Sequence, residues 1–283
     1  MSRRLSSLLV QHGLVYTVLI PGSILTLIPL LWTISTSLKT LDQLNVYPPS
    51  WIPNPVAWWN YRELFEIQPI PLYLRNTLIV VAAWEIGGLI SCSFVAYGFA
   101  RLRFPGRDFF FMLLLSTMMM PYIVRLIPLF VIYTKLGWIN TFLPLIIPPL
   151  LARNPFYIFL FRQFFRTIPE ELADAARIDG CSEFGIWWRI ILPLSKPAMA
   201  AVAIFAFQSA WDDFLAPLIY MGNRPELRTL AVGLYYFRNM PGQLPMVHYL
   251  MAMSVLMIIP VLLVFAFGQR YFIRGVAMSG LKG

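Results

Sequence analysis

Six apolar segments in this chain are each long enough to cross a lipid bilayer, and this feature limits the possible folds more than any other. A helix needs about 20 mostly apolar residues to span the hydrocarbon layer. Of the 283 residues, 59% are hydrophobic and 12% are charged, which excludes a soluble globular domain. We expect an all-α polytopic membrane protein whose residues 1–283 form a single transmembrane domain. The expected spans are residues 14–36, 76–100, 108–134, 141–161, 198–221 and 247–269.

Positive charge is divided unevenly between the two sides of these spans. Six spans place both termini and residues 166–197 on one side, and that side holds 13 of the 22 lysines and arginines. Because short loops rich in Lys and Arg stay in the cytoplasm, we expect both termini to be cytoplasmic. The net charge of +9 is scattered between apolar runs, which argues against a nucleic-acid-binding patch.

One polar stretch, residues 166–197, is too charged to cross a membrane itself. Thr167 and Glu170 have the spacing of a capping box at the start of a helix. Gly180 is placed to end that helix. Ser182 is placed to cap a second short helix, which we expect to stop at the proline that follows Leu192. The stretch therefore predicts a helical hairpin between two membrane spans.

The first helix of this hairpin has a face of mostly small residues that needs a partner surface. Its members recur at helical spacing: Leu172, Ala175, Ala176 and Asp179. Physical chemistry alone leaves two interpretations open. One is an amphipathic hairpin that lies on the lipid surface, and the other is a docking site for a soluble partner.

The same stretch resembles the EAA motif of importer-type ATP-binding cassette (ABC) transporter membrane subunits. The motif consists of EAA, three residues, Gly, nine residues and Ile-x-Leu-Pro. At the same spacings this chain has Asp174-Ala175-Ala176, Gly180 and Ile190-Ile191-Leu192-Pro193. The one departure, Asp174 in place of Glu, keeps the charge.

This resemblance implies a role for the hairpin as the coupling helix that sits in a groove of an ATP-binding subunit. The residues to which it assigns this ATPase-coupling role are Glu171, Asp174, Ala175, Ala176, Asp179, Gly180, Ile190, Leu192 and Pro193.

Further segments, in the same order along the chain, resemble the second membrane subunit of maltose-type carbohydrate-uptake transporters. Along the chain they are residues 97–101 with 104–106, 163–169, 211–214 with 217–218, and 269–272 with 275 and 280–283. The resemblance covers nearly the whole chain. It implies the type I ABC importer permease fold and a function in sugar translocation that is coupled to ATP hydrolysis.

The resemblance also implies a set of partners in a bacterial or archaeal cell (inner) membrane. They are a sister permease that completes a heterodimer, two ATP-binding subunits and an extracytoplasmic solute-binding protein. No cofactor is expected on this chain, and ATP and Mg²⁺ belong to the partner ATPase. Because the sequence has no Gly-x-x-x-x-Gly-Lys-Ser/Thr phosphate loop, we expect a transport subunit and not an enzyme.

Charged and hydrogen-bonding side chains within the apolar spans are candidates for a substrate path, because charge is costly in a membrane. Trp211 adds an aromatic face of the kind that sugar sites use. The candidates are Trp211, Asp212, Asp213, Gln208, Arg125, Arg153 and Asn154. A structural alternative stays open for each charge, namely pairing inside the bundle or placement at the water boundary.

Three competing functions remain open. One is an ABC permease for a polyol or glycerol phosphate, and Arg125 and Arg153 would favour an anionic cargo. An autonomous secondary carrier would leave the EAA stretch without a role. A membrane enzyme would need a catalytic or metal-binding set, but the sequence has only two histidines, His12 and His248, and these stand alone.

Overall fold

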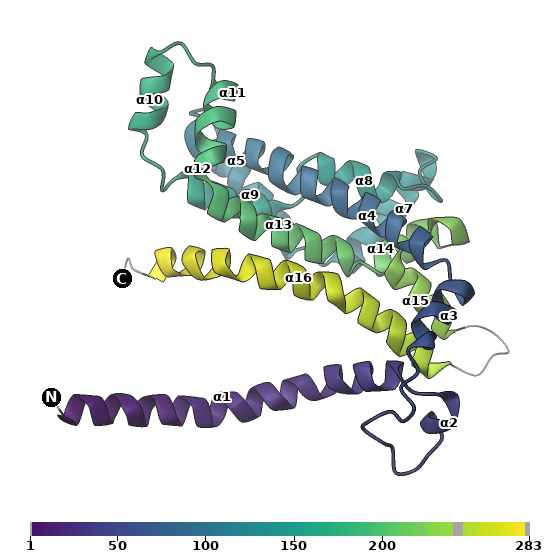
Figure 1. The fold of residues 1–283 in the computed structure, drawn as a ribbon. Helices are drawn as coiled ribbons and strands as arrows, with labels where there is room; N and C mark the ends of the chain where they lie inside the picture. Colours follow the sequence, from purple (N-terminus) through teal and green to yellow (C-terminus); the bar gives the residue numbers. More distant parts are fainter. Residues whose placement is uncertain (1, 223, 240–245, 281–283) are drawn as a thin grey trace. The chain divides into compact units, whose positions relative to one another are not determined.

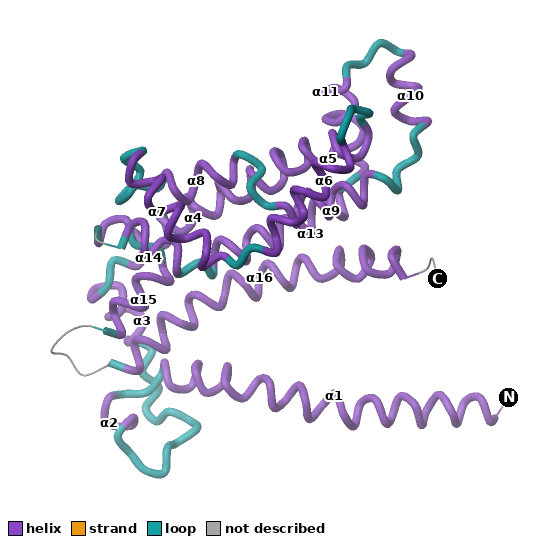
Figure 2. Tube along the Cα trace, turned by 180° about the vertical axis from the view of Figure 1, so that it is seen from behind, coloured by secondary structure: helices purple, strands orange, loops and turns teal. Residues whose placement is uncertain are grey.

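The computed structural model describes residues 2–222, 224–239 and 246–280, with side chains for residues 15–222, 224–239 and 246–268. Within these ranges the chain is helical and has no strand. It divides into two compact units, Met1–Pro69 with Leu234–Ile259 and Ile70–Gly233 with Pro260–Gly283. Figures 1 and 2 show the helices from opposite sides.

The first unit contains the N-terminal helix and the proline-rich connection that follows it. Its helices are α1 (Ser2–Ser37), α2 (Leu41–Leu44), α3 (Trp59–Ile67) and the adjoining parts of α15 (Leu230–Arg238) and α16 (Val247–Gly280).

A buried asparagine organises that connection. The Asn60 Nδ2 donates to the Ser37 and Lys39 carbonyl oxygens, both at 2.9 Å. The Lys39 ammonium lies 4.1 Å from the ring centroid of Trp32 on α1, a cation–π contact. Ser37 is the last residue of α1 and Lys39 lies just beyond it, so the asparagine supplies hydrogen bonds that the end of a helix lacks.

The second unit is a helical bundle that carries the polar hairpin. Its helices are α4 (Ile70–Ile86), α5 (Cys92–Arg101), α6 (Arg107–Ser116), α7 (Tyr122–Lys135), α8 (Leu143–Leu150), α9 (Pro155–Phe165), α10 (Glu171–Ile178), α11 (Glu183–Ile186), α12 (Leu192–Leu194), α13 (Lys196–Trp211) and α14 (Leu215–Met221), with the remaining parts of α15 and α16. Helices α4 and α5 join through a π-helical turn, Gly87–Ser91, and pack against α8, α9 and α13.

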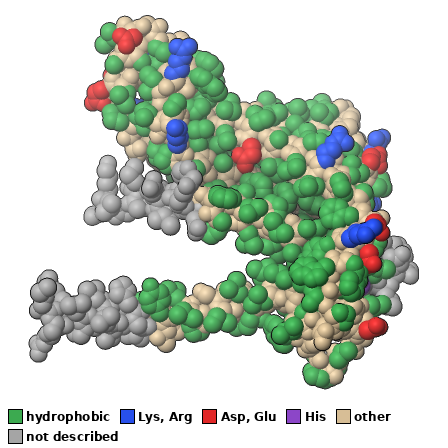
Figure 3. Space-filling model, in the orientation of Figure 1, with side chains coloured by type: hydrophobic (Ala, Val, Ile, Leu, Met, Phe, Trp, Pro, Cys, Tyr) green, Lys and Arg blue, Asp and Glu red, His purple; other side chains and the backbone are tan. Residues whose placement is uncertain are grey.

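A core of aromatic and aliphatic side chains holds the bundle and the root of the hairpin together. Tyr97 of α5, Phe161 and Phe165 of α9, Trp187 beyond α11 and Val202 of α13 are all buried in it. In the space-filling view, hydrophobic side chains cover most of the face over α4 and α13, and charged ones are sparse there (Figure 3). A surface of this kind suits lipid.

The expected spans match the helices to different degrees. The first, second and last agree closely with apolar helical segments Val15–Ser37, Ile70–Arg101 and Val247–Gly268. By length and composition, the described residues contain four candidate spans, or six if each of two bent pairs is one span. The span expected at residues 141–161 corresponds to the candidate span Leu143–Phe165, within which a non-helical stretch separates α8 from α9. The expectation of an all-α polytopic membrane protein is confirmed.

The spans expected at residues 108–134 and 198–221 are not continuous helices. The third is bent by 100° between Arg107–Met119 and Tyr122–Lys135. In the fifth, α13 ends at Trp211, and three residues separate it from α14, which begins at Leu215. At its start, α13 meets the preceding helix Glu183–Leu194 at 84°. Hydropathy detects apolar length but not these interruptions, because the residues at the breaks are partly apolar.

One close helix contact yields a stability prediction. A Cβ built on Gly87 would lie 2.1 Å from the Pro149 carbonyl oxygen of α8, whereas one on Gly98 of α5 would meet nothing within 4 Å. We expect Gly87→Ala to destabilise the purified chain by about 1–3 kcal/mol through overpacking. The matched control, Gly98→Ala, is expected to stabilise it by up to about 1 kcal/mol.

Thermal unfolding of the two variants in the same detergent checks this prediction. Equal unfolding temperatures for the two variants would show that the backbones of the second span and α8 do not approach as closely as described.

Candidate functional site

The polar hairpin turns at a glycine. Gly180 has φ 78°, a left-handed conformation that costs glycine little. The Gly180 N–H donates to the Arg177 carbonyl oxygen at 3.0 Å, and the Cys181 N–H donates to the Ala176 carbonyl oxygen at 2.9 Å. These bonds satisfy carbonyls at the end of α10. The prediction that Gly180 ends the first hairpin helix is confirmed.

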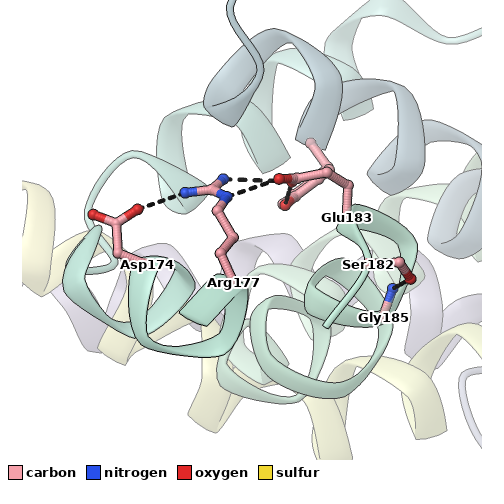
Figure 4. A network of polar contacts seen from close by, with 6 residues as sticks. Asp174, Arg177, Ser182, Glu183 and Gly185 are labelled. Carbon is pink, nitrogen blue, oxygen red and sulfur yellow. Dashed lines mark hydrogen bonds and ion pairs between the residues drawn. The ribbon is translucent and has the colours of Figure 1, made fainter. Parts of the chain in front are cut away.

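The second hairpin helix begins as expected and ends later. The Ser182 Oγ accepts from the Gly185 N–H at 3.2 Å and caps α11 (Figure 4). The chain then continues through a π-helical turn, Trp187–Ile191, into α12. Pro193 lies inside α12, so the expectation that it stops the second helix is wrong. The helix ends one residue after Pro193, at Leu194.

The capping box expected at the start of the hairpin is also wrong. The Thr167 Oγ1 donates to the Phe164 carbonyl oxygen at 2.7 Å, and α10 begins at Glu171 without a side-chain cap. The preceding helix α9 ends at Phe165, and its last carbonyls need partners from outside the helix. The Phe164 carbonyl oxygen accepts from both the backbone N–H of Thr167, at 2.9 Å, and its hydroxyl, so the hydroxyl closes the end of α9 and does not cap the next helix.

The small residues of α10 are divided between two faces. Ala173 and Ala176 are 0% and 9% exposed and pack into the bundle core. Leu172 and Ala175 are exposed, and Ile178 is 88% exposed. The single small face expected from the sequence is therefore incorrect: Ala176 belongs to the buried face, and the outer face has a mixed apolar character.

An ion-pair network ties the hairpin to the second span. The Arg177 Nη1 lies 2.6 Å from the Asp174 Oδ1, and its Nε lies 2.7 Å from the Glu183 Oε1 (Figure 4). Tyr97 of α5 donates its hydroxyl to the Glu183 Oε2 at 2.5 Å. Glu183 raises the pKa of the Arg177 guanidinium. These pairs are partly solvated, so each contributes at most about 1 kcal/mol to the free energy of unfolding. Their main effect is to hold the hairpin in a fixed position against α5.

A cavity of about 420 Å³ lies within the second unit where three breaks in the helices meet. The first break follows α6, the second separates α8 from α9, and the third separates α13 from α14. The second and third breaks each contribute two lining residues, Arg153 with Asn154 and Asp212 with Asp213. At the first break, Thr117 and Met118 lie in the 3₁₀ turn just before the bend and Tyr122 lies just after it.

The side chains that end or start helices at these breaks also line the cavity. The Asn154 Oδ1 accepts from the Phe156 N–H at 3.0 Å at the start of α9. The Asp213 Oδ1 accepts from the Ala216 N–H at 3.2 Å at the start of α14. Ala152, just before the second break, has a positive φ of 55°. Local chemistry at the helix ends therefore directs polar groups into the cavity.

The structure brings most of the expected path residues together. Those that line the cavity are Arg125, Arg153, Asn154, Asp212 and Asp213. Trp211 and Gln208 lie outside its lining. Trp211 is 2% exposed and stacks on Phe207, with ring centroids 5.3 Å apart. Because Phe207 precedes Trp211 by one helical turn of α13, the two rings pack against each other, and Trp211 serves packing.

Sequence reasoning missed the uncharged part of the cavity wall, because it selected charges. Trp84, Gly88 and Cys92 line the cavity at four-residue intervals along the second span, and that spacing was the available signal. Tyr157 and Ser209 complete the wall, with their hydroxyl oxygens 3.2 Å apart. The cavity thus combines aromatic faces, hydroxyl groups and both signs of charge.

Comparison with known proteins agrees with this geometry. Residues 73–278 match the family described as binding-protein-dependent transport system inner membrane component. The chain is 41% identical over 213 residues to an arabinooligosaccharides transport system permease protein of Halalkalibacterium halodurans, covering 75% of this chain and 74% of the relative. It is 34% identical over 267 residues to an sn-glycerol-3-phosphate transport system permease protein of Brucella abortus, covering 92% and 94%.

A solved structure shows the same fold. A chain in the crystal structure of a bacterial ABC transporter involved in the import of the acidic polysaccharide alginate superposes with a TM-score of 0.82 and 24% identity, covering 92% of this chain and 96% of that one. At this identity the similarity supports the fold alone. The family match and the curated relatives show that this chain belongs to the binding-protein-dependent transport system inner membrane components, the permease subunits of ABC importers.

Proposed function

We propose that this permease forms a sugar translocation path with a sister permease and couples that path to ATP hydrolysis by two partner ATPase subunits. The observation that supports this most is the convergence of three helix breaks on one polar and aromatic cavity. Irregular backbone is tolerated at membrane depth only where it is buried in protein or lines a cavity. Transporters commonly build substrate sites from such discontinuous helices.

The cavity wall favours a neutral polyhydroxylated cargo. Its two arginines, Arg125 and Arg153, are matched by Asp212 and Asp213, so the lining has no net charge. Trp84 and the tyrosines offer aromatic faces, and the charged groups offer donors and acceptors for sugar hydroxyls. The runner-up cargo is glycerol phosphate. The Brucella abortus relative, whose name states this cargo, supports it, but the balanced wall leaves no excess positive charge for a phosphate.

The hairpin supplies the proposed coupling element. Its outer face presents Leu172, Ala175 and Ile178, a surface that an ATPase groove would cover. Arg177 and Glu183 connect that face to Tyr97 of the second span. Movement of a docked ATPase would therefore reach the bundle directly. ATP and Mg²⁺ are assigned to that partner, and this chain is assigned no catalytic step.

The same assignment places the hairpin and both termini in the cytoplasm, where ATP is available, and an extracytoplasmic solute-binding protein on the opposite side. The proposed docking segments for that protein are residues 37–75 and 222–245, whose described parts include α2, α3, the start of α4 and α15. Several residues of this assignment lie outside the described side chains, including the basic and C-terminal motif residues at positions 3, 4, 269–272, 274, 275 and 280–283. Their roles stay predictions.

The deciding experiment begins with a pull-down of the full chain from its native host in mild detergent, followed by identification of its partners. The complex is then placed in vesicles and tested with labelled arabino-oligosaccharides, maltose and sn-glycerol-3-phosphate. ATP-dependent uptake of a neutral oligosaccharide is expected. Uptake of sn-glycerol-3-phosphate alone would show that the cargo is glycerol phosphate and not a neutral sugar. Transport by the isolated chain without ATP would favour a secondary carrier.

Two adjacent alanines test the docking face. Ala175→Arg places a charge on the exposed face, and we expect at least about a tenfold loss of co-purifying ATPase with unchanged thermal unfolding. Ala176→Arg places it in the bundle core, and we expect more than about 2 kcal/mol of destabilisation. Normal ATPase recovery with Ala175→Arg would exclude this face as the coupling surface.

The cavity is tested by Asp212→Asn, which removes a charge while nearly preserving side-chain shape. Loss of one charge-assisted hydrogen bond to sugar, about 1.5–3 kcal/mol, is expected to raise the half-saturating sugar concentration at least about tenfold. The complex should still assemble. Asp108→Asn, at the exposed start of α6 and outside the cavity lining, is the control and should leave uptake unchanged. A normal half-saturating concentration for Asp212→Asn would remove Asp212 from the path.

A further inference from the structure

A second cavity, of about 340 Å³, is lined mainly by arginines and lies apart from the proposed sugar path. It is formed where α5 ends, α6 begins and α9 ends. Figure 2 shows these three helices near the base of the hairpin. Glu170 is the one carboxylate of its lining, and the basic residues are Arg101, Arg103, Arg107, Arg162 and Arg166.

Two of these arginines are held in place by the bundle. Arg162 is 8% exposed, and its guanidinium carbon lies 4.0 Å from the ring centroid of Phe111. Its Nε donates to the Phe99 carbonyl oxygen at 3.2 Å. Arg101 donates from Nη2 to the Phe165 carbonyl oxygen at 2.6 Å, while its Nε is buried without a hydrogen-bond partner. The cavity therefore contains fixed positive charge with remaining capacity to donate hydrogen bonds.

The nearby carboxylates do not balance this charge. Asp108, which is 72% exposed, lies 3.1 Å from Arg107 and 3.6 Å from Arg162. Arg101 and Arg103 also line an adjoining pocket with Glu171, Asp174 and Glu183, of which Asp174 and Glu183 pair with Arg177. This leaves three carboxylates, Asp108, Glu170 and Glu171, against the five arginines. Helix α6 also starts at this point, after Gly106, without a side-chain cap, so its first N–H groups add to the positive potential. Concentrated and partly buried positive charge of this kind favours the binding of an anion.

The position of the cavity along the helices indicates where that anion comes from. Three apolar segments end here: Ile70–Arg101, Arg107–Met119 and Leu143–Phe165. The ends of apolar segments mark the boundary between hydrocarbon and water, where lipid phosphates lie. Phe104 and Phe109 line an adjoining hollow together with Arg103 and Arg107, and both phenylalanines have exposed side chains. The surface thus offers guanidinium groups to a phosphate beside apolar rings that suit an acyl chain.

We propose that this arginine pocket binds the phosphate headgroup of an anionic phospholipid at the membrane boundary. The phosphate accepts hydrogen bonds from the guanidinium groups in a geometry that suits arginine. A lipid is favoured over a free phosphate because the bilayer holds its headgroups at this depth and at high local concentration. The site is separate from sugar transport and does not depend on the nature of the cargo.

The full chain, purified in detergent, is tested by native mass spectrometry with added phosphatidylglycerol or with phosphatidylcholine of the same acyl chains. The test variant Arg103→Gln/Arg166→Gln removes two exposed arginines of the pocket. The control Arg189→Gln/Lys196→Gln removes two exposed charges from the hairpin region outside it. Thermal unfolding of both variants establishes that they fold as the unmodified chain does.

We expect the unmodified chain to bind phosphatidylglycerol more tightly than phosphatidylcholine. The pocket variant should bind phosphatidylglycerol about thirtyfold more weakly, a factor of about five for each arginine, and the control should match the unmodified chain. Equal binding by the two variants, or equal affinity for the two lipids, would overturn the proposal. So would equally tight binding of inorganic phosphate, which would identify a free anion, or loss of lipid binding when the ATPase subunit associates, which would identify a protein interface.

Discussion

The need to satisfy backbone hydrogen bonds in a medium without water controls this structure. In the second span a π-helical turn at Gly87–Ser91 keeps the helix continuous from α4 to α5. Three interruptions in other helices border one cavity, and local side chains cap two of the new ends, as Asn154 and Asp213 do. Because each break creates unpaired polar groups that need partners, grouping the breaks is less costly than scattering them. The same grouping gives a transport protein a polar site inside an apolar bundle.

Charged side chains form three groups in the second unit, and the ratio of positive to negative charges differs among the groups. The cavity at the helix breaks has matched arginines and aspartates. The hairpin pairs Arg177 with Asp174 and Glu183 and reaches the second span through Tyr97. The arginine pocket has excess positive charge. A balanced wall can hold a neutral cargo, a paired hairpin keeps its shape when a partner docks, and an unbalanced pocket favours an anion from outside the chain.

Features that depend on neighbours in the chain were predictable, and those that depend on distant segments were not. Gly180 and Ser182 act within one helical turn, and both behave as expected. Thr167 does not, because the end of α9 competes for its hydroxyl. Trp211 looked suited to a sugar, but Phe207, one turn earlier on α13, occupies its ring face. For Ala175 and Ala176, helical spacing alone could not distinguish the exposed residue from the buried one.

The sequence by itself determined that the chain spans a membrane, that a polar hairpin interrupts the spans and that the hairpin resembles an ABC coupling element, because apolar length, charge and motif spacing are local properties. Only the tertiary structure decided which helices break, which polar groups meet and which face of the hairpin stays free. Those outcomes depend on packing between α4, α8, α9 and α13. Residues as far apart as Trp84, Arg153 and Asp213 line one cavity because the bundle brings them together, and no local pattern records that proximity.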